Sequence, residues 1–189
     1  MTYRIFSATA LLAALTSGAA GAAPVQWAGN GHWYELIIDD LQTTFSGALG
    51  AAAARTWMGD DGYLATITSG LEQAFLDAVN PNGYTAWLGG GDRRVEADWR
   101  WLNGPEAGEV FTYTNWSAGE PNNCCGGEHG LLGWWSGNHW NDIYDGAGAY
   151  AYVVEYGAAP STVPLPAGLP LLGFGLGAFG LVALRRRSV

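Results

Sequence analysis

The chain contains no lysine, and arginine supplies all eight of its basic residues. Four of these arginines lie near the two ends, whereas all 17 acidic residues fall between Glu35 and Glu155 together with the other four arginines. The central segment therefore carries a large excess of negative charge. Because nucleic acids and anionic lipids are themselves polyanions, this excess argues against both as partners, and it is compatible with a divalent cation.

Cysteine and catalytic motifs are also scarce. With only two cysteines, Cys124 and Cys125, a small fold framed by disulfides is excluded. The chain has no Gly-x-Ser-x-Gly elbow, no His-Glu-x-x-His motif and no phosphate-binding loop, so we predict that it is not an enzyme. An aromatic content of 13% argues against disorder, and the length of 189 residues suits one domain with processing segments at its ends.

Residues 1–22 have the pattern of a secretory signal peptide. Arg4 supplies the positive start, residues 5–15 form an apolar run, and Ala20-Gly21-Ala22 is a small-residue cleavage site. The sequence therefore predicts that the protein is exported.

The C-terminal end carries a tail in three parts. A linker with the motif Val-Pro-Leu-Pro-Ala occupies 159–167, and an apolar helix followed by three arginines occupies 168–189. The apolar part would be about 25 Å long as a helix, just short of a bilayer core, with its arginines on the cytoplasmic side. A permanent membrane anchor has this pattern. The order of the parts also resembles the VPLPA variant of the PEP-CTERM sorting signals. That resemblance implies transient insertion into the inner membrane and removal of the tail by exosortase-type machinery, which leaves the protein at the cell surface or outside the cell.

Residues 24–158 are predicted to form one domain. Its expected elements are strands at 32–39, 63–68, 85–89, 99–102 and 150–156, and helices at 45–58 and 70–80. Ser69 and Glu72 form a capping box at the start of the second helix. The apolar face of that helix is expected to consist of Leu71, Ala74, Phe75, Ala78 and Val79. Residues 103–149 are Gly-rich and lack a regular pattern, which predicts a long functional loop that a bound metal orders.

This loop contains five side chains with hard oxygen donors: Glu120, Asn122, Glu128, Asn141 and Asp142. Carboxylate and amide oxygens suit Ca²⁺ much better than zinc, which favours thiolate and imidazole ligands. His129 and His139 lie nearby, but without thiolates or a His-rich spacing a zinc site is only a minor alternative. Pro121 has a use within this set, because a cis peptide is inexpensive only before proline and would turn its two neighbours toward one ion.

The set as a whole resembles the C-type lectin-like family. Glu120-Pro121-Asn122 and Trp140-Asn141-Asp142 match the calcium and sugar motifs of that family, and three further segments match its strands: Trp87-Leu88-Gly89-Gly90, residues 98–104 and Val153-Val154-Glu155. The resemblance implies an α+β, C-type lectin-like fold in which two helices flank short antiparallel sheets with a long calcium-binding loop. It also implies that the five oxygen-bearing side chains hold Ca²⁺ and share it with two sugar hydroxyls. The Glu-Pro-Asn form is linked to mannose, glucose and fucose.

The same resemblance points to an auxiliary calcium site at Asp92, Glu96, Asn123 and Glu128. Within it, Asn123 and His129 stand where the family has acids. The usual disulfide partners of the family are missing, and Cys124 and Cys125 lie inside the ligand loop instead. A vicinal disulfide, an intermolecular link and free thiols are all open for this pair.

The functional prediction is an exported, calcium-dependent carbohydrate-binding protein of a bacterial envelope or extracellular matrix. Its expected partner is a glycan of the mannose, glucose or fucose type, or an exopolysaccharide. The alternative is a structural or adhesive module that binds protein or matrix, in which calcium only orders the loop.

Overall fold

The computed structural model describes residues 23–124 and 127–157. The predicted signal peptide, the C-terminal linker and tail, and Cys125 lie outside the described residues. The described chain contains helices α1 (Phe45–Ala53) and α2 (Gly70–Val79) and a set of short strands. The strands are β1 (Val25–Gln26), β2 (Trp33–Thr43), β3 (Thr56–Trp57), β4 (Asp60–Leu64), β5 (Ala86–Gly91), β6 (Arg100–Trp101), β7 (Glu128–Gly133), β8 (Asn141–Tyr144) and β9 (Ala149–Tyr156). The predicted α+β class is confirmed. None of the described helices is long and apolar enough to span a membrane.

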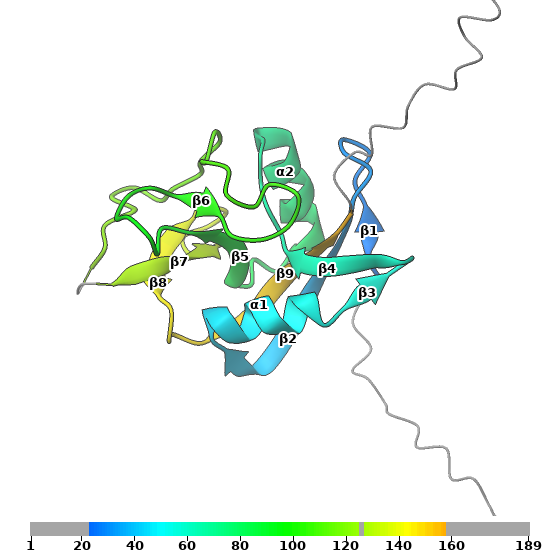
Figure 1. The fold of residues 1–189 in the computed structure, drawn as a ribbon, viewed down its shortest axis with the longest axis horizontal. Helices are drawn as coiled ribbons and strands as arrows, with labels where there is room; N and C mark the ends of the chain where they lie inside the picture. The colour runs from blue at the N-terminus through cyan, green and yellow to red at the C-terminus, as the bar shows by residue number, and fades with distance from the viewer. Residues whose placement is uncertain (1–22, 125–126, 158–189) are drawn as a thin grey trace, which may run out of the picture. The chain divides into compact units, whose positions relative to one another are not determined.

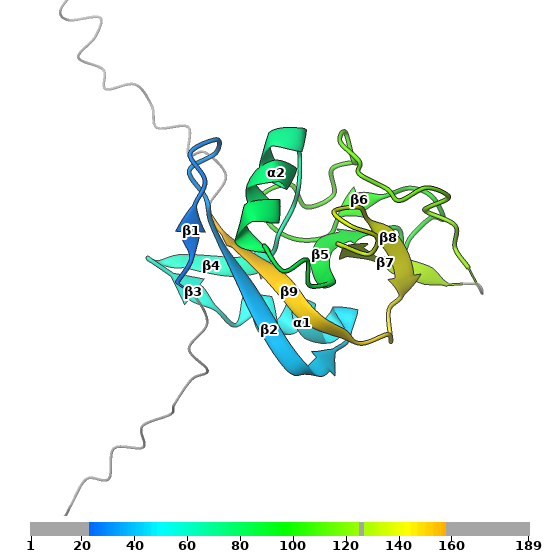
Figure 2. The same cartoon turned by 180° about the vertical axis from the view of Figure 1, so that it is seen from behind.

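The centre of the fold is the antiparallel pair of β2 and β9, which lie side by side in Figure 2. Strand β5 joins β9 in parallel, and the sheet continues through β7 to β8. The other strand pairs are antiparallel, so the expected antiparallel sheets hold except at this one junction. Figure 1 shows β6, β7 and β8 with their loops on one side of the domain and β1 to β4 on the other.

Helix α1 ends five residues before the predicted end. Thr44 caps its start by accepting from the Gly47 N–H, and the Ala54 N–H closes the last turn on the Gly50 carbonyl. Arg55 then leaves the helix, because its guanidinium donates to Glu35 and to the Tyr156 hydroxyl. The following residues turn into the β3–β4 hairpin instead of continuing the helix.

Helix α2 begins as predicted, but only part of its predicted face is buried. Phe75 and Val79 pack against the core, whereas Ala74 and Ala78 are exposed. The Ser69 hydroxyl accepts from the Glu72 N–H, whereas the Glu72 carboxylate binds the Thr68 N–H and hydroxyl. Leu71, predicted to be buried, is 78% exposed. Leu76 is fully buried, and the polar Glu72 and Gln73 are buried beside it because each has hydrogen-bond partners there. Gln73, for example, accepts from the buried indole of Trp140 at 2.8 Å.

The predicted loop at 103–149 contains two strands, β7 and β8, which pair with each other and continue the sheet beyond β5. The sequence of β7, Glu-His-Gly-Leu-Leu-Gly, has no polar–apolar alternation. Its last four residues are buried, so no solvent-facing side imposes a period of two. The prediction of a loop without regular structure was wrong for these segments.

Aromatic side chains fill much of the core, as expected for a domain that lacks the usual disulfides of the family. Trp87, Trp99 and Trp101 are buried, and Trp33, Trp57 and Trp116 pack partly buried against the same clusters. Trp140 meets four rings edge-on, at centroid distances from 5.6 to 6.4 Å: Trp101, Phe111, Tyr113 and Trp116. This cluster lies directly before Asn141 in the chain and supports the start of β8.

A network of buried carboxyl groups lies between α2 and the β2–β9 pair. The Tyr34 hydroxyl donates to Glu72 at 2.5 Å and contacts Glu155 at 3.0 Å, and His32 contacts Glu155 at 2.6 Å. Burial raises the pKa of Glu72, and this effect outweighs the hydrogen bonds from Tyr34 and Thr68 that favour the charged form. The folded chain therefore retains the Glu72 proton at a pH where the unfolded chain has released it.

We expect Glu72→Gln to change how stability depends on pH. The wild-type free energy of unfolding loses the Glu72 contribution as pH rises from the ordinary value of 4.5 through the raised pKa, because the folded state holds the extra proton in that window. Glutamine does not titrate, so the stability of Glu72→Gln relative to wild type should increase with pH across this window. Urea unfolding at several pH values measures the difference. The exposed Glu109, changed to Gln, is the control and should give a nearly constant difference. A flat profile for Glu72→Gln would contradict the raised pKa.

Candidate metal centre

The Glu-Pro-Asn segment is positioned by backbone hydrogen bonds to the start of β8. The Trp140 N–H donates to the Asn115 carbonyl, and the Ser117 N–H donates to the Trp140 carbonyl, both at 2.8 Å. A turn follows in which the Glu120 N–H donates to the Ser117 carbonyl at 3.0 Å. The Glu120–Pro121 peptide bond is cis, as the sequence analysis suggested. These contacts bring the segment beside the Asn-Asp pair that opens β8.

Asp142 is the centre of this arrangement and is 1% exposed. Its two carboxylate oxygens accept from the backbone N–H groups of Asn122, at 3.1 Å, and Asn123, at 2.8 Å. The Cys124 N–H contacts both the Asn122 side-chain oxygen, at 2.7 Å, and the Glu128 carboxylate, at 2.8 Å. Three of the five predicted ligands, Asn122, Glu128 and Asp142, are thus linked by one set of hydrogen bonds.

Glu120 adds a third carboxyl group to this cluster. Its Oε2 atom is buried and has no hydrogen-bond partner among the described residues. Burial, the neighbouring Asp142 and then Glu128 raise the pKa of Glu120. Burial and Asp142 also raise the pKa of Glu128. Within the described part of the chain, these crowded carboxylates have an unpartnered oxygen and no ion pair with an arginine. A hard cation would satisfy such a donor set.

Asn141 lies next to Asp142 at the start of β8 and is buried. Its amide nitrogen donates to the Asp142 carbonyl at 2.6 Å. Among the described hydrogen bonds, none joins the Asn141 side chain to Glu120, Asn122 or Glu128. The structure therefore places Asn141 beside the cluster through its position on the strand, and its role as a ligand stays a prediction.

A second group of potential ligands lies where the auxiliary site was predicted. The ligand atoms of Asp92, Glu96 and His129 all lie within 4.8 Å of one another. The His129 Nδ1 is 2.9 Å from one carboxylate oxygen of Asp92, and the other oxygen accepts from the Ala97 N–H. The family resemblance placed His129 in the same site as Asp92, as a departure from the acids of the family. The structure adds the direct contact between the two side chains.

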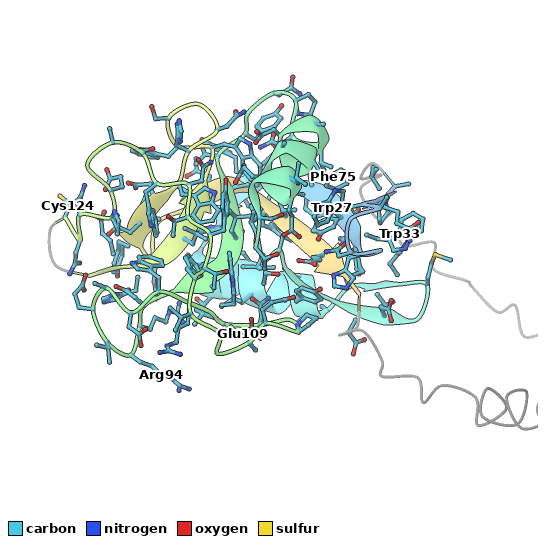
Figure 3. All side chains as sticks on the ribbon, turned by 90° about the horizontal axis from the view of Figure 1, so that it is seen from above. Trp27, Trp33, Phe75, Arg94, Glu109 and Cys124 are labelled. Atoms are coloured by element: carbon cyan, nitrogen blue, oxygen red, sulfur yellow. The ribbon has the colours of Figure 1, made fainter. Side chains whose placement is uncertain are left out.

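Asn123 connects the two groups. Its side-chain nitrogen donates to Glu96 at 2.6 Å, and its oxygen accepts from the backbone N–H groups of Gly127 and Glu128. Cys124 is exposed and lies at one end of the domain in Figure 3, opposite Trp27 and Trp33. Because Cys125 lies outside the described residues, the disulfide between them stays a prediction.

Comparison with known proteins matches the model of the family described as "Lectin C-type domain" to residues 51–151. Halomucin from Haloquadratum walsbyi is 35% identical over 139 residues, which are 68% of this chain and 1% of that protein. A perlucin-like protein from Mytilus galloprovincialis is 37% identical over 71 residues, and the hepatic lectin of Gallus gallus is 40% identical over 58. These matches cover 37% and 31% of this chain, and 43% and 27% of the two proteins. The chain thus spans less than half the length of each of these relatives.

Solved structures share the fold. The lectin CEL-I from Cucumaria echinata superposes with a TM-score of 0.57 at 23% identity, over 68% of this chain and 91% of that one. The carbohydrate-recognition domain of cow CD23, solved in the presence of a GlcNAc2Man3 oligosaccharide, superposes with a TM-score of 0.55 at 28% identity, over 68% and 89% of the two chains.

Proposed function

Because the chain belongs to the C-type lectin domain family, we propose that it binds carbohydrate through a calcium ion held by the loop between β6 and β7 together with the first residues of β7 and β8. The proposed ligands are Glu120, Asn122, Glu128, Asn141 and Asp142. The observation that supports this proposal best is the crowding of three carboxyl groups in which Glu120 Oε2 is buried without a partner. Such an arrangement costs free energy unless a cation neutralises it.

The mix of side chains in this site suits a sugar as the partner. Bound Ca²⁺ would supply a positive centre with room for oxygen ligands from outside the protein. Carboxylates such as Glu120 accept hydrogen bonds, and amides such as Asn122 can also donate them, so together they match hydroxyl groups that do both. The Glu-Pro-Asn triplet favours sugars of the mannose, glucose and fucose type. Turnover of the sugar is not expected.

The proposed setting is the outside of a bacterial cell or its matrix, with a glycan or exopolysaccharide as partner. The predicted signal peptide and VPLPA tail support export, transient membrane insertion and sorting by exosortase-type machinery. Within the domain, Trp33 pairs with Tyr156, and Figure 3 places Trp33 at the end opposite Cys124 in the ligand loop.

Retention on sugar resins tests the proposal. We expect the purified protein to be retained on mannose resin in calcium and released by chelator or by free mannose. Retention on galactose resin should be weaker, because the triplet of this chain is Glu-Pro-Asn. Thermal unfolding with and without calcium provides the second readout, since an ion that binds only the folded state raises its stability.

Two results would lead to different conclusions. Calcium-dependent stability without retention on either resin would favour the structural or adhesive module, in which calcium only orders the loop. Indifference to calcium in both retention and stability would reject the five-ligand site.

A further inference from the structure

The cluster of Asp92, Glu96 and His129 differs from a calcium site in its chemistry. The family resemblance implies an auxiliary calcium ion here, but the donors that the chain brings together are two carboxylates and one imidazole. We propose that these three side chains bind a divalent transition-metal ion of the zinc type.

The imidazole of His129 favours a zinc-type ion over calcium. Calcium takes oxygen ligands almost without exception, and a nitrogen donor in its shell is unfavourable. Imidazole together with carboxylate suits zinc and its neighbours, which bind nitrogen and oxygen at about 2.0–2.2 Å. His129 directs Nδ1 toward the Asp92 carboxylate at 2.9 Å. A tetrahedral ion with such bonds separates its ligand atoms by about 3.3 Å, so a small opening of this contact admits the metal.

Asn123 also disfavours calcium, because its side-chain oxygen is used in other hydrogen bonds and is not available as a ligand. Its side-chain oxygen accepts from the N–H groups of Gly127, at 2.8 Å, and Glu128, at 3.1 Å. These bonds fix the amide so that its nitrogen faces Glu96 at 2.6 Å. An amide nitrogen donates hydrogen bonds and is not a metal ligand. The Glu128 carboxylate contacts the Cys124 N–H, on the side of the Glu-Pro-Asn segment.

The burial and fixed orientation of Asp92 are also typical of a metal ligand. Asp92 is 2% exposed, and its second oxygen is held by the Ala97 N–H at 2.9 Å, so this carboxylate is fixed before any ion arrives. Partners of this kind orient ligands in metal sites. Glu96 is exposed and His129 is partly exposed, which leaves a route from solvent and an open position for water.

A bound ion would join two distant parts of the chain. Asp92 directly follows β5, and His129 is the second residue of β7. The Asn123 side chain donates to Glu96, and its backbone N–H donates to the Asp142 carboxylate. The ion would therefore also stiffen the loop that holds the proposed calcium ligands. The site does not depend on sugar binding, so each proposal can fail without the other.

Calorimetric titration of the purified protein with Zn²⁺, in the presence of millimolar Ca²⁺, tests the site. We expect the wild type to bind one Zn²⁺ that calcium does not displace, and His129→Ala to weaken this binding by more than about tenfold. The control is His139→Ala, because His139 contacts Asn115 and lies outside the cluster. It should bind Zn²⁺ as the wild type does. Near-UV circular dichroism checks that each variant is folded.

His129→Asp is the second variant, and it replaces the nitrogen donor by oxygen. We expect it to lose Zn²⁺ affinity by at least about tenfold. The proposal is overturned if the wild type binds no Zn²⁺, if millimolar calcium displaces the Zn²⁺, or if His129→Ala binds as tightly as His139→Ala. The last result would identify adventitious surface binding only.

Discussion

Asp142→Asn is expected to abolish calcium-dependent retention on mannose resin. Asp142 is buried, and both of its oxygens accept backbone N–H groups of the Glu-Pro-Asn segment. The amide keeps the size of the side chain but removes its charge and turns one acceptor into a donor that faces a backbone N–H. A hydrogen bond to a charged group contributes about 1.5–3 kcal/mol, so the loss of one corresponds to about tenfold or more in binding. Loss of a calcium ligand adds to this.

Glu109→Gln is the matched control for this variant. Glu109 is exposed, and Figure 3 shows it well away from Cys124 in the ligand loop. The substitution removes the same unit of negative charge without touching the site, so retention should equal that of the wild type. Circular dichroism establishes that Asp142→Asn is folded. A folded Asp142→Asn protein that is retained and eluted like the wild type would place the sugar site elsewhere.

Trp140→Ala is expected to lower the free energy of unfolding by about 3–5 kcal/mol, the usual cost of removing a fully buried aromatic side chain. The Trp140 side chain is fully buried and packs against four aromatic rings. Its indole also donates to Gln73, which would be left buried without this partner. Urea or guanidinium unfolding followed by circular dichroism measures the loss.

Trp135→Ala separates this packing effect from a general effect of removing tryptophan. Trp135 is 51% exposed, so its removal should change the free energy of unfolding by about 0.5 kcal/mol or less. Equal losses in the two variants would contradict the placement of Trp140 at the centre of the core.

Local sequence signals predicted the starts of both helices and the end of α2, but they did not predict the end of α1 or all of the buried face of α2. The Ser69 cap is a short-range interaction within one turn, and it is present in the structure. The end of α1 depends on Arg55, whose partners Glu35 and Tyr156 are distant in the chain. The inner face of α2 depends on Tyr34 and Trp140, which supply hydrogen bonds to Glu72 and Gln73. Hydrophobic periodicity gives no information about such partners.

The sequence by itself determined the fold class and the residues of the candidate site. The Glu-Pro-Asn and Trp-Asn-Asp triplets are contiguous in the chain, and their oxygen chemistry is evident from residue type alone. Only the tertiary structure decided how these residues are held, because the contacts between Asn122 and Asp142 span 20 positions and run through the backbone. It also decided the chemistry of the second cluster. His129 and Asp92 are 37 positions apart, and their contact arises only because β7 pairs with β5 and brings both side chains to the same edge of the sheet.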